Sequence, residues 1–301
     1  MRILLIGGSG FLSGTVARSA LAAGHDVWAV TRGQRALPAG VHGLIADRHD
    51  SAALSRVVRA VGIAFDLAVD CIGYKVEDMR QDIALLPGLA RHFVFISTDF
   101  VFDPRHRLFP QTVEHRAFLQ DDSYGAHKRR CEEALLAADC GALTWTILRP
   151  CHIYGPGSLL GCLPRHGRDP ELLARLRRGE SLQLVGGGHY LQQPVFAADL
   201  ARLVLACPAA AHAHGRIFHT AGSDIVESVR YYEIIADLLG VPLRVEELPV
   251  DAYRAAHPEH ASFLCHRIYD MRPLADAGLP VPGTRLVDGL REHVRSLTSD
   301  R

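Results

Sequence analysis

Lysine is scarce in this sequence. It occurs only at Lys75 and Lys128, so 31 of the 33 basic residues are arginine. There is no excess of either charge, because the 33 basic residues are matched by 33 acidic ones. Proteins that bind nucleic acid usually carry a basic excess or a basic patch. The balance therefore predicts no nucleic-acid partner, and the scarcity makes the position of each lysine informative.

Cysteine pairs with CxxC spacing are missing, and so is an HExxH motif. The seven scattered cysteines are typical of reduced thiols rather than of a disulfide framework. Without a tight Cys/His cluster, no metal site is predicted. No apolar run approaches the length of a membrane span, and the expected first strand starts at residue 2, which leaves no room for a signal peptide. We therefore expect a cytoplasmic protein without a membrane partner.

The first 150 residues alternate short apolar runs with helical patterns. Strands are expected at 2–6, 26–30, 44–46, 65–71, 92–97 and 144–148, and helices at 11–23, 51–60, 76–90 and 124–139. This rhythm is typical of a buried parallel sheet with helices on both faces. It predicts an α/β fold with a Rossmann-type, doubly wound parallel sheet.

After Pro150 the pattern changes. Residues 151–192 are rich in Gly, Pro and His, and further helices are expected at 170–178 and 228–240, with a short strand and a helix over 195–206. We expect a dinucleotide-binding domain over 1–150, with a return segment near 193–222. The rest of 151–301 is expected to form mainly a smaller α/β lobe that binds substrate over the carboxyl edge of the sheet.

A glycine-rich turn, Gly7-Gly8-Ser9-Gly10-Phe11-Leu12-Ser13-Gly14, joins the first strand to the first helix. Close backbone approach at such a turn exposes amides, and the helix N-terminus favours a pyrophosphate. This predicts dinucleotide contacts at Gly7, Ser9, Gly10, Phe11 and Leu12. The alternative is a tight turn that binds no ligand.

The end of the second strand distinguishes the two nicotinamide cofactors. NAD binders usually place an acid there for the ribose hydroxyl, whereas this chain has Thr31 followed by Arg32. A guanidinium suits a 2′-phosphate, so NADP(H) is favoured over NAD(H), unless Arg32 is only a solvated loop residue. Asp47, after the third strand, is expected either to accept a hydrogen bond from the adenine or to cap a helix.

Tyr124 and Lys128 are four residues apart on an expected helix, so both lie on the same face. A neighbouring ammonium and an oxidised nicotinamide would lower the pKa of the tyrosine, which could then exchange a proton with a substrate hydroxyl or carbonyl. Thr98, at the carboxyl end of the fifth strand, would hydrogen-bond the same oxygen. The alternative is an unrelated pair on a surface helix.

The glycine turn, Thr98 and the Tyr124/Lys128 pair together resemble the extended short-chain dehydrogenase/reductase family, and the resemblance continues through 148–157 and 185–201. It implies Tyr124 as acid/base, Lys128 on the nicotinamide ribose and Thr98 as the third catalytic residue. It also implies contacts of Pro150 with the nicotinamide amide and of His152 with substrate. The segment Cys71-Ile72-Gly73, after the fourth strand, is expected to touch the cofactor as well.

The subfamily is less clear from the motifs. Residues 97–103, STDFVFD, are similar to those of dTDP-4-dehydrorhamnose reductases and in part to those of 4,6-dehydratases. The dehydratases need a glutamate where this chain has Phe100, which argues against dehydration. Asp99 is expected to donate a proton or to orient substrate, next to Phe100. The glycine turn and the segments after the second and third strands resemble the epimerase-like group that includes chloroplast stem-loop RNA-binding proteins.

Gln192 stands where nucleotide-sugar enzymes commonly have an arginine that holds a diphosphate. An amide would bind a diphosphate less well. Either another arginine replaces it, with Arg165, Arg168 and Arg267 as candidates, or the substrate is not a nucleotide sugar. Gln192 and Arg267 are nevertheless taken as substrate contacts, although Gln192 could be a surface residue and Arg267 a structural one.

Three hypotheses follow. The first is an NADP(H)-dependent oxidoreductase that acts on a carbonyl or secondary alcohol of a sugar-like or aminocyclitol-like metabolite. The second is a nucleotide-sugar epimerase with tightly bound NAD. The third, disfavoured by the zero net charge, is a non-enzymatic RNA-binding relative. The family resemblance further implies a homodimer formed through the helices near 76–90 and 124–139.

Overall fold

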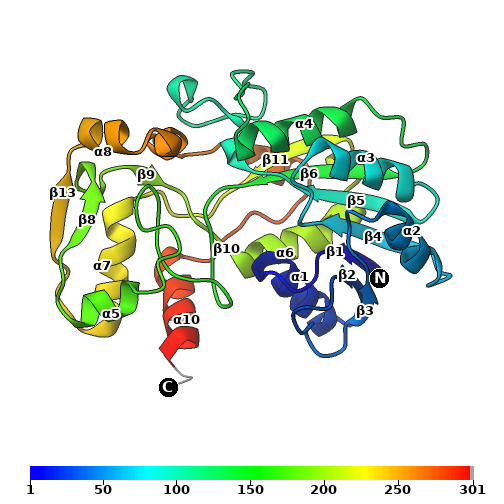
Figure 1. Ribbon diagram of the computed structural model, residues 1–301, viewed down its shortest axis with the longest axis horizontal. Coiled ribbons are helices and arrows are strands. Elements are labelled where there is room, and N and C mark those ends of the chain that lie inside the picture. The colour runs from blue at the N-terminus through cyan, green and yellow to red at the C-terminus, as the bar shows by residue number, and fades with distance from the viewer. Residues whose placement is uncertain (299–301) are drawn as a thin grey trace.

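The computed structural model describes residues 1–298 and shows two lobes joined by several crossings of the chain (Figure 1). A seven-stranded parallel sheet forms the larger lobe, with strand order β3-β2-β1-β4-β5-β6-β11. Its strands are β1 (Arg2–Ile6), β2 (Asp26–Thr31), β3 (His42–Ile45), β4 (Phe65–Asp70), β5 (Ala90–Ile96), β6 (Thr144–Pro150) and β11 (Arg216–Thr220). This order confirms the predicted Rossmann-type sheet.

Helices cover both faces of the sheet (Figure 1). One face carries α1 (Phe11–Ala22) and α6 (Ala197–Ala206), and the other carries α2 (Ser51–Arg59), α3 (Val76–Leu85) and α4 (Tyr124–Leu136). Successive side chains of a strand point to opposite faces, so in β1 Ile3 and Leu5 pack with α1 and α6, whereas Leu4 packs with the other helices. The four apolar residues 3–6 of β1 are therefore buried, with neighbours on both faces of the sheet.

Several elements differ from their predicted bounds. The helix predicted at 76–90 ends at Leu85, because Pro87 and the left-handed Gly88 (φ 76°) follow it. The next strand consequently starts at Ala90 instead of residue 92. β3 covers His42–Ile45 rather than 44–46, and α4 ends three residues before the predicted residue 139.

The smaller lobe is built from short strand pairs and helices. Its strands are β7 (Ile153–Tyr154), β8 (Leu182–Val185), β9 (Leu191–Gln192), β10 (Val195–Phe196), β12 (Val226–Glu227) and β13 (Val245–Leu248). Its helices are α5 (Leu172–Arg177), α7 (Ser228–Leu239), α8 (Val250–Ala256) and α10 (Leu286–Thr298). Tyr231 and Tyr232 of α7 pack with Leu290 of α10 in its core.

Segments of the second half of the chain return to the larger lobe. β11 pairs with β6, and α6 lies against α1. Helix α9 (Arg272–Asp276) also belongs there, because Leu274 and Leu279 are buried in the core cluster of α1 and α6. The chain therefore crosses between the lobes several times, and these crossings hold the two lobes in position relative to each other. No helix within residues 1–298 is long and apolar enough to cross a membrane.

Candidate active site

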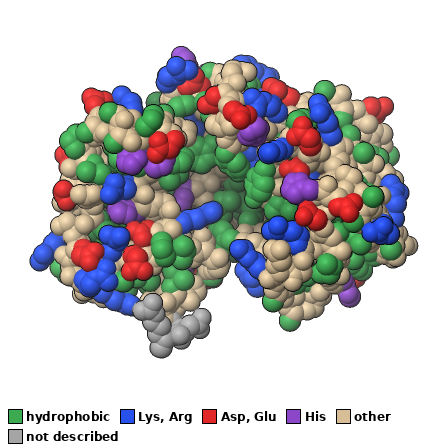
Figure 2. Space-filling model, in the orientation of Figure 1, with side chains coloured by type: hydrophobic (Ala, Val, Ile, Leu, Met, Phe, Trp, Pro, Cys, Tyr) green, Lys and Arg blue, Asp and Glu red, His purple; other side chains and the backbone are tan. Residues whose placement is uncertain are grey.

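A cleft lies between the two lobes, and Figure 2 shows the molecule hollowed there. It has two connected sections that share Gly10, Ile72 and Tyr74. The section nearer the smaller lobe, which we call the inner cleft, holds about 450 Å³. The section over β2 and β3, the outer cleft, holds about 440 Å³. The cleft follows the carboxyl ends of the parallel strands, where ligands of doubly wound sheets bind.

The glycine turn forms the floor where the two sections meet. A Cβ on Gly7, which has φ 84°, would lie 2.7 Å from Ile72 Cγ2, and one on Gly8 would lie 2.3 Å from Ala29 Cβ. Glycine is therefore required for β1 to pass into α1 without displacing its neighbours. Gly10 caps α1 without a side chain, so the amides of the first turn remain available. This cradle fits a pyrophosphate.

The predicted turn contacts line the cleft on both sides of this junction. Gly7 and Ser9 face the outer cleft, whereas Phe11 and Leu12 face the inner cleft. Gly10 contributes to both sections. A dinucleotide with its pyrophosphate at α1 would therefore place one nucleoside in each section.

Arginines without partners line the outer cleft. Arg32 and Arg35 are exposed there and form no hydrogen bond or ion pair within residues 1–298. β2 ends in Thr31 and not in an acid. The Thr31 hydroxyl accepts a hydrogen bond from the Gly33 amide at 3.2 Å. Asp47 also lines this section, but Asp50 caps α2, so the helix-cap interpretation of Asp47 is corrected.

The loop after β4 is held by a buried charge cluster that the sequence analysis missed. Asp70 is fully buried and pairs with Arg48 at 2.8 Å. Its Oδ1 accepts the amides of Ile72 at 2.7 Å and Gly73 at 2.8 Å. Burial opposes ionisation, but Arg48 holds the pKa of Asp70 below its usual value. Cys71 and Ile72, which were predicted to touch the cofactor, line the inner cleft. Gly73, predicted with them, lies outside both sections, and its amide donates to Asp70.

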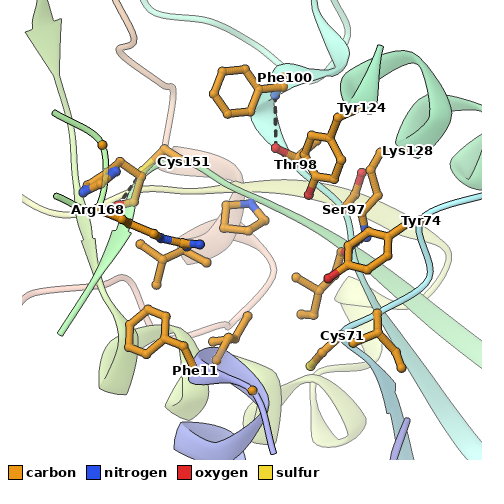
Figure 3. Close-up of a pocket in the computed structure, with 18 of the residues that line it drawn as sticks. Phe11, Cys71, Tyr74, Ser97, Thr98, Phe100, Tyr124, Lys128, Cys151 and Arg168 are labelled. Carbon is orange, nitrogen blue, oxygen red and sulfur yellow. Dashed lines mark hydrogen bonds between the residues drawn. The ribbon is translucent and has the colours of Figure 1, made fainter. Parts of the chain in front are cut away.

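Thr98, Tyr124 and Lys128 come together in the inner cleft (Figure 3). Thr98 follows β5, and Tyr124 is the first residue of α4. The helix can approach because Gly125 has no side chain. A Cβ there would lie only 1.9 Å from the Phe100 carbonyl oxygen. The close approach of α4 to the end of β5 thus places the three predicted catalytic side chains in one compartment.

Lys128 is almost completely buried, with 1% of its surface exposed. Its Nζ donates to the Ile96 carbonyl at 2.7 Å and lies 4.6 Å and 5.1 Å from the ring centroids of Phe95 and Tyr74. Burial lowers the pKa of Lys128, while Asp70 opposes this shift. One donor position is therefore fixed by the backbone, and the other protons remain for a ligand.

The pKa of Tyr124 corrects one expectation. The sequence analysis expected a lowered pKa, but burial raises the pKa of this phenol well above its usual value. Tyr74 and Asp99 raise it further, whereas the Thr98 hydroxyl lowers it. The side chain is 48% exposed, and its ring centroid lies 6.2 Å from that of Tyr74. In the chain alone, Tyr124 is therefore a protonated hydroxyl at neutral pH.

Asp99 does not reach the cleft, which corrects its expected role in donating a proton or orienting substrate. The carboxylate is fully buried and accepts from Arg267 at 2.6 and 2.9 Å, from Arg107 at 3.2 Å, and from the Tyr269 hydroxyl. Although burial opposes ionisation, these arginines hold the pKa of Asp99 below its usual value. It joins the end of β5 to the C-terminal segment instead.

The remaining predicted substrate contacts divide in two. Phe100, His152 and Arg267 line the inner cleft, and so does Pro150, which was expected to contact the nicotinamide amide. Gln192 does not, because the β9–β12 pairing holds it buried, with 1% exposed. This corrects both the expected substrate contact and its alternative as a surface residue. Burial lowers the pKa of His152 to about 3, and Arg267 and Arg168 add to the shift, so its imidazole is neutral.

Sequence analysis also missed cleft residues and their supports. Tyr74 and Phe263 line the inner cleft. Ser97 also lines it and donates to Glu132 at 2.6 Å, and Glu132 forms an ion pair with Arg149 at 2.7 Å. The signal for this network was Arg149, which directly follows the expected strand at 144–148, since a buried arginine requires a partner.

Comparison with known proteins identifies the family. A model of the NAD dependent epimerase/dehydratase family matches residues 3–221. The chain belongs to this family. The match confirms the resemblance to extended short-chain dehydrogenases/reductases.

The individual relatives share 25% or less of their residues with this chain. The chloroplast stem-loop binding protein of 41 kDa b from Arabidopsis thaliana is 25% identical over 240 residues, which are 75% of this chain but only 60% of that protein. A UDP-glucose 4-epimerase from Thermotoga maritima, solved with UDP-glucose, has a TM-score of 0.79 at 19% identity and covers 100% of this chain and 99% of its own. A dTDP-glucose 4,6-dehydratase from Bacillus anthracis, solved with NAD, has a TM-score of 0.75 at 15% identity and covers 100% and 97%. These structures share the fold.

Proposed function

We propose that the protein is an NADP(H)-dependent oxidoreductase that acts on a carbonyl or secondary alcohol of a sugar-like or aminocyclitol-like metabolite. One observation carries the proposal. Thr98, Tyr124 and Lys128 meet in an inner cleft that is continuous with the pyrophosphate cradle. A hydroxyl acid/base beside a dinucleotide site suits proton exchange coupled to hydride transfer.

Tyr124, Thr98 and Lys128 each have a separate role in the proposed reaction. A bound nicotinamide would supply or accept the hydride. In reduction, the protonated Tyr124 hydroxyl gives its proton to the substrate carbonyl oxygen, while Thr98 donates a hydrogen bond to the same oxygen. In oxidation the proton returns to Tyr124. Lys128, fixed on Ile96 O, would hold the nicotinamide ribose with its remaining N–H groups and would add positive charge beside the phenol.

The preference for NADP(H) rests on the outer cleft. Two unpaired guanidiniums, Arg32 and Arg35, line it, and β2 ends in Thr31 instead of an acid. Guanidiniums bind phosphate through paired, charge-assisted hydrogen bonds. The solved relatives of the family include proteins with bound NAD, so NAD(H) is the cofactor against which this preference must be measured.

The first experiment identifies the nucleotide. Protein purified without added cofactor is denatured, and the released nucleotides are separated and quantified. The proposal expects less than stoichiometric nucleotide, and NADPH binding to the emptied protein that is tighter than NADH binding. Stoichiometric, tightly held NAD would instead support the second candidate, a nucleotide-sugar epimerase. That candidate is favoured by the likeness to the epimerase solved with UDP-glucose.

Two partner expectations accompany the proposal. The Arabidopsis relative is named for stem-loop binding, but the zero net charge disfavours RNA here. Filter binding with structured RNA at moderate salt is expected to show no retention. We also propose a homodimer through α3 and α4, which lie against each other on one face of the sheet (Figure 1). Sedimentation of the wild-type chain tests the dimer.

A further inference from the structure

The inner cleft has positively charged walls. Lys128, Arg168 and Arg267 line it, and none of the described residues that line it is aspartate or glutamate, while Asp99 pairs with Arg267 behind the wall. A cleft with low-dielectric walls and charges of one sign concentrates ligands of the opposite charge. The inner cleft therefore favours an anionic ligand over a neutral one.

The three cations differ in how far they are already neutralised. Lys128 donates to a backbone carbonyl, as described above. Arg267 is buried and gives Nε and Nη2 to Asp99, while its Nη1 has no hydrogen-bond partner in residues 1–298. Arg168 is exposed in the cleft and forms no hydrogen bond or ion pair within the same residues. Unused donors are thus present at both arginines.

The missing partner of Arg168 is not explained by a lack of nearby acid. Asp169 is its neighbour in the chain, but that carboxylate faces His166 at 3.1 Å and Arg175 at 3.7 Å. The Asp169 carboxylate is therefore engaged by other groups, including the Glu171 amide, and it does not pair with Arg168. Figure 3 shows Arg168 reaching into the cavity from the side opposite Tyr124 and Tyr74.

The loop that carries Arg168 is fixed. His166 Nε2 donates to the Gln183 carbonyl at 3.0 Å, and the Asp169 amide donates to the Leu160 carbonyl at 2.8 Å. A Cβ on Gly161 would lie 1.6 Å from the His166 carbonyl oxygen, so the two sides of the loop are in close contact. Arg168 has φ 59° and is the only non-glycine residue in 1–298 with a positive φ. An ordered loop therefore presents this guanidinium to the cleft.

Arg168 acts in the same compartment as the proposed acid/base. Its charge lowers the pKa of Tyr124 and of Tyr74 against the larger effect of burial, and it lowers the pKa of His152 as well. An anion bound by Arg168 therefore lies within electrostatic reach of the Tyr124 hydroxyl. Arg168 and Tyr124 line the same inner cleft of about 450 Å³, so one small molecule there can contact both side chains.

We propose that the substrate carries an oxyanion, either a carboxylate or a phosphate monoester, on the same sugar-sized unit as the reacting carbon, and that Arg168 binds it together with Nη1 of Arg267. A guanidinium suits both groups because it offers two parallel N–H donors. The reacting carbon in this statement rests on the proposed function, whereas the anion site rests on the cleft itself.

The test compares matched ligands by calorimetry on the NADP⁺-saturated protein. The probes are D-galactose, D-galacturonate, galactose 6-phosphate and UDP-galactose. We expect at least one of the two small anions to bind roughly tenfold or more tightly than galactose. R168Q, and R168G, which suits the positive φ, should reduce that affinity to the level of galactose. Arg165 lies in the same loop but does not line the inner cleft, so R165Q should keep affinity within about twofold.

Three results would overturn the inference: equal binding of galactose and both small anions, unchanged anion affinity in both Arg168 variants, or UDP-galactose binding that is tightest and independent of Arg168. The tighter of the two small anions identifies the oxyanion. Turnover of NADPH is measured separately. If no carbonyl compound is reduced while anion binding still depends on Arg168, the proposed function fails and the anion site stands.

Discussion

Gly125, the second residue of α4, lies so close to the Phe100 carbonyl that a Cβ would stand 1.9 Å from its oxygen. This contact joins the helix of Tyr124 and Lys128 to the end of the strand that carries Thr98. The relative position of the proposed catalytic groups therefore depends on one missing side chain.

G125A tests this contact. Because the obstacle is backbone, α4 must shift, and we expect a loss of about 1–3 kcal/mol in the free energy of unfolding together with weaker proton transfer. A Cβ on Gly283 would meet only the Val281 carbonyl oxygen, at 3.9 Å, and Gly283 has no positive φ, so G283A is the matched control and should be nearly neutral. Urea unfolding measures the free energy of unfolding of both variants, and the rate of NADPH oxidation measures proton transfer. A stable, unimpaired G125A would mean that the helix approach is not required.

The raised pKa of Tyr124 predicts its titration. Burial favours the neutral phenol, so in the protein without cofactor Tyr124 should ionise only above the usual tyrosine value of about 10. Saturating NADP⁺ should lower that pKa by adding positive charge. Ultraviolet difference titration of wild type against Y124F isolates this signal. Ionisation near neutral pH without cofactor would contradict the structure.

The buried pair of Glu132 and Arg149 predicts acid sensitivity. Arg149 outweighs burial and holds the pKa of Glu132 below its usual value. A depressed folded-state pKa means that the stabilisation is complete above the unfolded value of about 4.3 and is lost as pH falls through the folded value. E132Q should lose about 3–5 kcal/mol at pH 7 and show a flatter dependence on acid.

Glu133 provides the control for that comparison. It neighbours Glu132, is half exposed and pairs with Arg129 at 3.1 Å. E133Q should change the free energy of unfolding by less than about 1 kcal/mol. Urea midpoints at neutral and acidic pH measure both variants. Equal effects of the two substitutions would show that the buried network adds nothing beyond a surface ion pair.

Arg32 predicts cofactor choice. R32S removes a guanidinium from the outer cleft and should weaken NADPH binding roughly tenfold, with NADH affinity unchanged within about twofold. Arg56 of α2 is exposed and lines neither section, so R56S is the control. Quenching of NADPH fluorescence gives the dissociation constants. Equal losses for both cofactors would place Arg32 outside the 2′-phosphate site.

Local patterns in the sequence predicted much of the fold. β1 reads as a buried strand because residues 3–6 are all apolar, and the glycine turn and the Tyr124/Lys128 spacing identify their elements directly. The early end of α3 was missed although Pro87 and Gly88 mark it. Residues brought together from distant segments could not be predicted this way. Asp99 pairs with Arg267 across 168 positions, and only the folded chain shows that this pairing removes the carboxylate from the cleft.

The same limit applies to charge and burial at the site. Gln192 occupies a position that the family pattern assigns to a ligand contact, but β-pairing turns it inward. Lys128 was expected to lower the pKa of Tyr124 and to contact the nicotinamide ribose. In the structure, burial sets the pKa of both, and Lys128 is held by Ile96 and two aromatic rings.

The most direct test of the central claim is the rate of NADPH oxidation by wild type and Y124F with a panel of keto-sugars and cyclitol ketones, followed by NADPH absorbance. We predict turnover of at least one compound by the wild type, a loss of about 10²–10⁴-fold in Y124F, and NADPH affinity unchanged within about twofold. Full turnover in Y124F would contradict the assignment of Tyr124, and no turnover by the wild type with any compound would contradict the proposed activity.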